Sequence, residues 1–288
     1  MRWLFVGGGN MASSLVGGLI ASGATPVSVA VVEPADATRA QLHTRFGVVT
    51  ASDLPSLINA HESWRDAADG KLGIVLAVKP NIAQLACESL SKIGFEGNPA
   101  VLSVAAGVRS DTLSKWLGTR TAWSVMRCMP NTPALLGKGA SALHAGGATT
   151  AHRKAALELL NAVGTAVALD SEAEIDAVTA LSGSGPAYVF RLAELMIENA
   201  EALGLKPEDA RQLGIATIEG AAAMLVSGED DPSTLRQKVT SPGGTTAAAL
   251  KHFSTNGLDT CIRGGMIAAR DRAQQLGAEI DDSSPTHS

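Results

Sequence analysis

The stretch LFVGGGNMASSL, residues 4–15, decides the fold of the first part of the chain. A short apolar run stops at three glycines, and the apolar residues of the following segment, 10–22, recur with the period of a helix. Gly7, Gly9 and Ala12 fit the G-x-G-x-x-G/A fingerprint of a dinucleotide-binding strand–turn–helix unit. The first glycine allows a tight turn, the second lets backbone approach a pyrophosphate, and the alanine lets helix and strand pack closely. The alternative is a tight turn without a ligand.

The cofactor pyrophosphate is expected at the N-terminus of this helix, where free amides and the helix dipole favour an anion. The contacts expected there come from Gly8, Asn10 and Met11 in addition to the fingerprint glycines. Glu33 ends the next apolar run, about twenty residues on, where an acid binds the ribose 2′-hydroxyl of NAD. Arg39 could instead reach the 2′-phosphate of NADP, or simply face solvent. The choice between NADPH and NADH therefore stays open.

Apolar runs alternate with helical patterns up to about residue 170, which predicts βαβ units and a parallel sheet. After residue 170 the segments have helical patterns that begin with Ser, Pro or acidic residues and stop at Gly, and no strand pattern occurs there. We therefore expect an α/β protein with a Rossmann-type parallel-sheet domain at the N-terminus and an all-helical domain behind it. The expected ranges are 1–170, 171–280 and a frayed tail at 281–288.

Two further strand ends are expected to line the cofactor crevice. Lys79, in AVKP (77–80), would place an ammonium group beside ribose or phosphate, although a lysine at a strand edge is the plainer alternative. The run that ends in VAAG (104–107) offers only small residues, as expected where a nicotinamide ring lies close to backbone.

Composition excludes several classes of protein. Among 288 residues, 45% are hydrophobic and 18% charged, the formal net charge is −5, and no long basic run occurs, which argues against a nucleic-acid partner. No apolar run approaches a membrane span, and the first one is too short for a signal peptide. The three cysteines, an odd number without C-x-x-C, favour a reduced protein of the cytoplasm. The scattered histidines predict no metal site.

VTSPGGTTAAAL, residues 239–250, interrupts the helical part with proline, glycines and hydroxyl residues. Gly243 and Gly244 carry no Cβ, so their amides can point together at an anion. The helix predicted to follow has unbonded N–H groups in its first turn, where a carboxylate fits. The alternative is an ordinary helix capped by Ser241 or Thr245.

Together these motifs resemble the pyrroline-5-carboxylate reductase family. The likeness rests on GGGNMA (7–12), AVKP (77–80), AAGV (105–108), MPNTPALL (129–136), IDAVTALSGSGPAYVF (175–190) and VTSPGGTT (239–246), in family order along nearly the whole chain. The resemblance implies reduction of 1-pyrroline-5-carboxylate to L-proline with NADPH, or with NADH as the alternative. It also implies a helical domain that interlocks with a second subunit, and dimers that commonly assemble into decamers.

The resemblance also implies roles for individual residues. Thr246 looks like the hydroxyl that bonds the substrate ring nitrogen, and the carboxylate cradle looks like Ser241, Gly243, Gly244 and Thr245. Glu172 matches an acid near the substrate. Cofactor contacts are matched by Ala77, Val78, Lys79, Pro80, Val104, Ala105 and Ala106.

Two departures from the family concern the adenosine end of the site. The segment LPSLINAHESWRDAADGK, residues 54–71, is longer than the family pattern and contains Trp64. Asp53 stands where relatives often carry an asparagine.

Two other functions compete with the reductase. A β-hydroxyacid dehydrogenase needs a lysine about four residues after a G-x-G that opens a helix, because an alcohol must lose a proton as hydride leaves. Val189 stands at that position after Gly183 and Gly185, which argues against the alcohol reaction. A nucleotide-binding scaffold without chemistry predicts a damaged substrate loop, whereas SPGGTT is intact.

Overall fold

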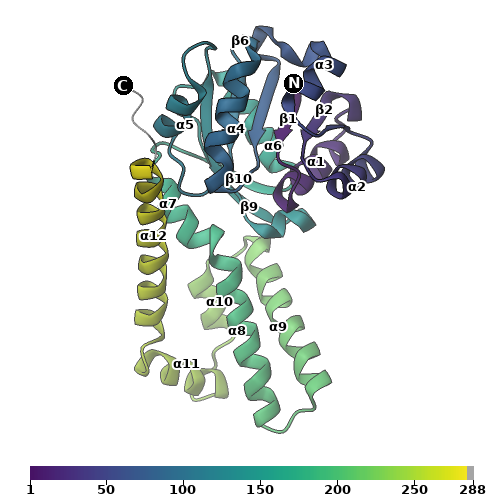
Figure 1. Ribbon diagram of the computed structural model, residues 1–288. Helices are drawn as coiled ribbons and strands as arrows, with labels where there is room; N and C mark the ends of the chain where they lie inside the picture. The colour runs from purple at the N-terminus through teal and green to yellow at the C-terminus, as the bar shows by residue number, and fades with distance from the viewer. Residues whose placement is uncertain (284–288) are drawn as a thin grey trace. The chain divides into compact units, whose positions relative to one another are not determined.

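The computed structural model describes residues 1–283, which divide into two compact units (Figure 1). The first contains residues 1–184 together with the described residues from Ala269 onward, and the second contains Gly185–Ala268. Strands end at Leu169, close to the expected change of character at 170. The division into compact units nevertheless falls after Ser184, because the short helices behind the last strand and the end of the C-terminal helix pack with the first unit.

The first unit is built on an eight-stranded sheet in the order β10-β9-β8-β7-β5-β1-β2-β3. Its strands are β1 Arg2–Val6, β2 Val29–Val32, β3 Val49–Ala51, β5 Leu72–Leu76, β7 Ala100–Ser103, β8 Ser124–Met129, β9 Gly139–His144 and β10 Gly164–Leu169. The expected parallel sheet is confirmed, and among the described strands only the β8–β9 pair is antiparallel. The link between β8 and β9 holds only the short helix η4, Thr132–Leu136, and a parallel crossover needs about a dozen residues or more.

Helices cover both faces of the sheet, and side-chain alternation along each strand assigns them to two cores (Figure 1). Trp3 and Phe5 of β1 face a core shared with α1 (Asn10–Ala21), α2 (Asp36–Phe46) and α6 (Thr150–Asn161). Leu4 and Val6 face the other core, with α3 (Leu54–Ala60), α4 (Pro80–Ile93) and α5 (Ser110–Leu117). Both faces are buried, which explains why these strands read as continuous apolar runs.

The long segment 54–71 is part of the folded core rather than a surface loop. After α3 it forms η2 (Glu62–Arg65), the short strand β4 (Asp66–Ala67) and η3 (Ala68–Gly70), and β4 pairs in parallel with β6 (Glu96–Gly97). Trp64 is buried, with the Arg2 guanidinium 5.5 Å from its ring centroid. Arg65 Nη2 donates to the Ile93 carbonyl at 2.8 Å, which ties the segment to the end of α4.

Every described element after β10 is helical, as expected. These elements are α7 Glu174–Val178, the π-helical turn η5 Thr179–Gly183, α8 Gly185–Ala202, α9 Pro207–Ser227, α10 Pro232–Lys238, α11 Thr245–Thr255 and α12 Leu258–Ser283. Helix α10 was not anticipated. Helix α12 runs three residues into the segment 281–288 that was expected to fray, and the remainder of that segment lies outside the described residues.

The second unit has little core of its own. Within Gly185–Ala268, Ala210 is the one buried hydrophobic residue. Helix α8 instead exposes Val189, Phe190, Leu192 and Leu195, each at least 40% accessible. Long helices with uncovered apolar side chains require another surface to bury them.

Candidate functional site

The glycine turn between β1 and α1 has the geometry that the fingerprint predicts. Gly7 has a φ of 99°, and a Cβ there would lie 2.6 Å from the Ala77 carbonyl oxygen, so no other residue fits. Gly9 has an ordinary φ of −66°, and a Cβ there would meet nothing within 4 Å. Packing within the chain therefore explains Gly7 but not Gly9, whose missing side chain leaves room for a ligand.

The N-terminus of α1 presents unbonded amides beside this turn. Gly9 is the N-cap, and no side chain caps the helix. The first intrahelical bond to the cap is Ser13 N–H to the Gly9 carbonyl, at 2.9 Å. Asn10 and Met11 lie in the first turn, where the amides lack helical acceptors and the dipole favours an anion. The buried Ala12 packs against the sheet, as expected.

Glu33 and Arg39 are both held by backbone at the end of β2. The Glu33 carboxylate accepts the amide of Gly8 at 2.8 Å through Oε2 and that of Ala35 at 2.9 Å through Oε1. Arg39 Nη1 donates to the carbonyls of Glu33 and Pro34, both at 2.7 Å, and its Nη2 pairs with the exposed Asp36. Glu33 is thus fixed at the glycine turn, while the Arg39 guanidinium is occupied by neighbouring acceptors.

A groove of about 580 Å³ runs from the glycine turn along the strand ends. It brings together the predicted residues Gly7, Gly9, Glu33, Ala77, Val78 and Lys79. Pro80 begins α4 directly behind Lys79, the N-cap of that helix. The other predicted cofactor residues, Gly8, Asn10, Met11, Arg39, Pro80, Val104, Ala105 and Ala106, are not part of the groove wall.

The loop behind β7 continues the line of strand ends. Val104 N–H donates to the Leu76 carbonyl at 3.2 Å, and the buried Ser103 hydroxyl accepts the Ala105 amide at 3.2 Å. Val104 and Ala106 are half-buried and Ala105 is buried. These contacts place the small residues beside the end of β5, where the groove residues also lie.

Asp53 has a structural task at the rim of the groove. Its carboxylate caps α3 by accepting the Ser56 amide at 2.7 Å, and the Ser52 hydroxyl donates to it at 2.8 Å. These hydrogen bonds, first of all those from Ser56, lower the pKa of Asp53. Asp53 therefore adds a negative charge to a wall of the groove.

Glu172 is engaged by groups that sequence reasoning did not connect with it. Its Oε1 accepts Arg127 Nη1 at 2.6 Å and the Ser110 amide at 2.8 Å. Burial raises the pKa of Glu172, but these two hydrogen bonds outweigh burial, so the pKa lies below its ordinary value. The Arg127 side chain is only 6% exposed. Its signal in the sequence was a lone charge within the apolar run SVMRCM.

The loop before α11 differs from expectation at one amide. Gly243 has a φ of 71°, as a turn glycine should. The Gly244 amide, expected to face an anion, instead donates to the Ser241 carbonyl at 3.0 Å, because the chain closes a tight turn there. Gly244 is the N-cap, and no side chain caps α11, so an ordinary capped helix is not what this sequence forms. The first-turn amides of Thr245 and Thr246 remain available, and Ser241 and Thr245 are exposed.

Within the described part of the chain, no helix is both long and apolar enough to cross a membrane. In the same residues, no group of three or more His, Cys, Asp or Glu side chains could hold a metal ion. Cys87 and Cys128 are buried, and burial raises the pKa of each thiol to about 12. Neither is therefore a reactive thiolate at neutral pH.

Residues 172–276 match the family described as pyrroline-5-carboxylate reductase dimerisation, and residues 3–107 match the family described as NADP oxidoreductase, coenzyme F420-dependent. A pyrroline-5-carboxylate reductase of Pseudomonas aeruginosa is 41% identical over 97% of this chain and 98% of its own. One of Arabidopsis thaliana is 33% identical over 94% of each chain.

Among solved structures, a pyrroline-5-carboxylate reductase from Coxiella burnetii is 38% identical, with a TM-score of 0.85 over 96% of this chain and 98% of its own. The two matched ranges include the glycine turn, the groove and the loop before α11. The chain therefore belongs to the pyrroline-5-carboxylate reductase family, whose reaction is the NAD(P)H-dependent reduction of 1-pyrroline-5-carboxylate to L-proline, the last step of proline biosynthesis.

Proposed function

We propose that the N-terminus of α11 binds the substrate carboxylate and that Thr246 bonds the ring nitrogen. The observation that carries this assignment is that no side chain caps α11, a helix of 11 residues whose N-cap residue is Gly244. Its first-turn amides can receive a carboxylate. Ser241, Gly243 and Thr245 shape the cradle around them. The Gly244 amide is left out of the cradle because it closes the turn on Ser241.

Hydride transfer to an imine carbon needs little acid catalysis when the nitrogen arrives protonated. A neutral hydroxyl is then sufficient to hold the ring N–H, and neither a histidine nor a lysine is needed at the reacting carbon. The reduced nicotinamide supplies the chemistry and the chain supplies orientation. Thr246 is half-buried, so its hydroxyl is partly shielded from competing water.

The groove of the first unit fits a dinucleotide, and we assign it to NADPH, with NADH as the alternative. The open space at Gly9 and the uncapped α1 would receive the pyrophosphate, with Asn10 and Met11 in the same turn. Lys79 would approach ribose or phosphate, and Val104, Ala105 and Ala106 would border the nicotinamide. A Plasmodium falciparum pyrroline carboxylate reductase, 24% identical with a TM-score of 0.77, was solved with NADP bound.

Glu172 keeps a proposed place near the substrate, and the contacts of its carboxylate favour an indirect role. By pairing with Arg127 and accepting the Ser110 amide, it links β8 to the start of α5. The loop that carries Val104–Ala106 lies between β7 and α5 along the chain. Glu172 is thus proposed as a group that positions this loop.

The functional assembly is proposed to be a homodimer, with a decamer as its further assembly. Helix α8 exposes apolar side chains that a second copy would bury, and the matched family is one of dimerisation. We further propose the cytoplasm as the compartment, in keeping with three free cysteines. No nucleic acid or membrane is assigned as a partner.

Turnover of 1-pyrroline-5-carboxylate by the purified protein tests the proposal. Loss of reduced-nicotinamide absorbance is followed with NADPH and, separately, with NADH, and L-proline is identified as the product. Turnover with either cofactor is expected, and the ratio of the two kcat/KM values gives the preference. A folded protein that binds cofactor but shows no turnover would contradict the reductase activity and would indicate a protein that only binds nucleotide.

A further inference from the structure

A small polar cavity lies in the first unit, and it has no lining residue in common with the cofactor groove. Its volume is about 160 Å³, and it is walled by the β7–α5 loop, β8, α7 with the residues before it, and the end of α12. All its lining residues belong to the first compact unit. At about 30 Å³ per water molecule, the space suits a small metabolite rather than a nucleotide or a peptide.

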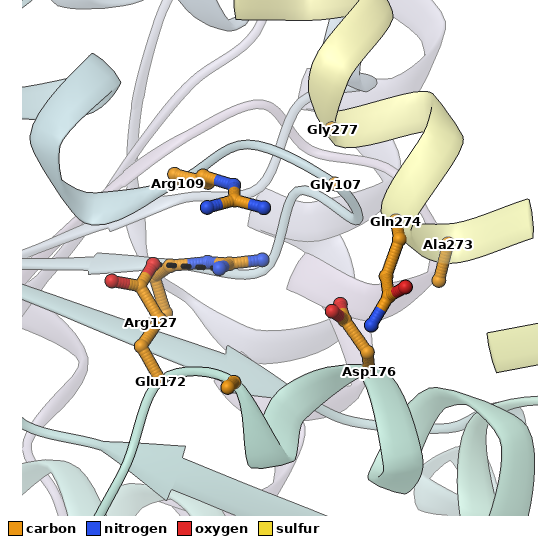
Figure 2. A pocket seen from close by; sticks show the side chains of 9 residues that line it. Gly107, Arg109, Arg127, Glu172, Asp176, Ala273, Gln274 and Gly277 are labelled. Atoms are coloured by element: carbon orange, nitrogen blue, oxygen red, sulfur yellow. Dashed lines mark hydrogen bonds and ion pairs between the residues drawn. The ribbon is translucent and has the colours of Figure 1, made fainter. Parts of the chain in front are cut away.

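Two guanidinium groups form one wall of this cavity. Arg127 is nearly buried, and it uses Nη1 for Glu172 while the far end of its guanidinium faces the open space (Figure 2). The Arg109 guanidinium lies over it and points the same way (Figure 2). Arg109 Nε lies 3.8 Å from Asp281 Oδ2, a loose ion pair. The wall can therefore donate hydrogen bonds to a carboxylate.

A carboxylate and an amide form the opposite wall. Asp176 of α7 and Gln274 of α12 point toward each other and into the cavity (Figure 2). Within residues 1–283, Asp176 takes part in no ion pair, unlike Glu172. The floor is closed by small residues, because Gly277 packs on Gly107 so tightly that a Cβ would lie 3.0 Å from the Gly107 carbonyl oxygen.

We propose that this cavity binds a small zwitterionic amino acid, with its carboxylate on Arg109 and Arg127 and its ammonium on Asp176. The lining carries two guanidinium groups and two carboxylates, so it is neutral overall and polarised from wall to wall. A simple anion would be attracted by the arginines but repelled by Asp176. A simple cation would be attracted by Asp176 but repelled by the arginines. A zwitterion satisfies both walls. The enzyme's own product, L-proline, is a zwitterion of this class.

The test is calorimetric titration of L-proline into the intact oligomer, in a Thr246→Ala background that weakens binding at the substrate loop. We expect one L-proline per chain to remain bound. Adding Asp176→Asn, or separately Arg109→Gln, should weaken this binding about tenfold or more, the scale of one lost charge-assisted hydrogen bond. Arg153→Gln, which removes an exposed arginine of α6 outside the cavity, is the matched control and should change nothing.

Binding does not depend on turnover, so its failure and the failure of the proposed reaction are separate results. The assignment is overturned if no L-proline binds in the Thr246→Ala background, or if both cavity variants bind like the control. Acetate or inorganic phosphate binding as tightly as L-proline would show a plain anion site and would also overturn it. The thermal midpoint of each variant establishes folding, and two independent cavity variants keep the test decisive if one is unstable.

Discussion

Thr246 contributes a single oriented hydroxyl in the proposed reaction. Thr246→Ala should raise the barrier by about 3 kcal/mol, on the scale of one lost oriented hydrogen bond in a reaction centre. The fall should appear in kcat and in kcat/KM, and Thr246→Ser should restore most of the rate. Steady-state kinetics measure this, with Thr255→Val, at the exposed last residue of α11, as the control. An alanine variant as fast as the wild type would remove Thr246 from the mechanism.

In the proposed cofactor site, the charge of Glu33 is expected to set the balance between NADPH and NADH. Its carboxylate is fixed by the Gly8 and Ala35 amides, so it cannot easily turn away from an arriving 2′-phosphate. Glu33→Gln keeps the shape and removes the repulsion, and should raise the NADPH to NADH ratio of kcat/KM by about tenfold. Glu62→Gln, at an exposed carboxylate outside the groove, is the control. An unchanged ratio in Glu33→Gln would shift the selection to Arg39 or Asp53.

At the scale of elements, the two glycines of the β1–α1 turn have different tasks. Gly7 is required by the fold, and Gly9 is assigned to cofactor binding. Gly7→Ala combines a positive φ with a clash on Ala77 and should destabilise the first unit. Gly9→Ala meets neither obstacle, so its thermal midpoint should match the wild type. Its cofactor KM should nevertheless rise about tenfold or more, since the methyl group enters the space assigned to the pyrophosphate. Fluorescence melting and cofactor titration measure the two effects. A cofactor KM unchanged by Gly9→Ala would place the pyrophosphate elsewhere.

Helix α6 carries a histidine that links stability to pH. His152 is 1% exposed, and neither ring nitrogen has a hydrogen-bond partner among the described residues. Burial lowers the pKa of His152, and the adjacent Gly70 backbone offsets this only in part. The folded chain then binds fewer protons than the unfolded chain below about pH 6.5, the ordinary histidine pKa.

Stability from His152 is therefore complete above about pH 6.5 and is lost as the pH falls from there toward the folded-state pKa. The slope for one proton is at most about 1.4 kcal/mol per pH unit. Urea midpoints between pH 8 and 5 measure it, at fixed protein concentration. His152→Leu should flatten the profile, whereas His61→Gln, at an exposed histidine, should leave it unchanged. Equal slopes in all three proteins would assign the pH dependence to other groups.

Sequence reasoning succeeded where one local pattern determines one element. The fingerprint glycines placed the β1–α1 turn, and the Pro and Gly signals placed α8 and α9 within a few residues. It failed where the answer depends on residues far apart in the chain. The reversal of β9 follows from a short link, and the pairing of Arg127 with Glu172 joins residues 45 positions apart. The Gly244 amide, expected to face an anion, donates to the Ser241 carbonyl, because turn closure competes with ligand binding for the same donor.

At the scale of the whole molecule, the helical unit depends on a second surface. Its helices bury almost nothing within Gly185–Ala268, so a subunit contact must supply the core. Phe190→Asp, at a side chain 63% exposed on α8, should shift the protein to a smaller species in light scattering after size-exclusion chromatography. Val27→Asp, equally apolar and 75% exposed but in the first unit, is the control. An unchanged mass for Phe190→Asp would exclude this face of α8 from the subunit contact.

Helix α12 determines the order in which the two units can finish folding during synthesis. The described residues from Ala269 onward belong to the first compact unit, yet they follow the whole helical unit in the sequence. Gly277 packs on Gly107, and Ile280 packs against the core beside α4 and α5. On the ribosome, where N-terminal domains usually finish folding first, this sheet unit must wait for the last helix to emerge. A premature stop at residue 269 would thus remove residues of the nucleotide-binding unit, although that unit is translated first. The helical unit, Gly185–Ala268, would keep all its residues.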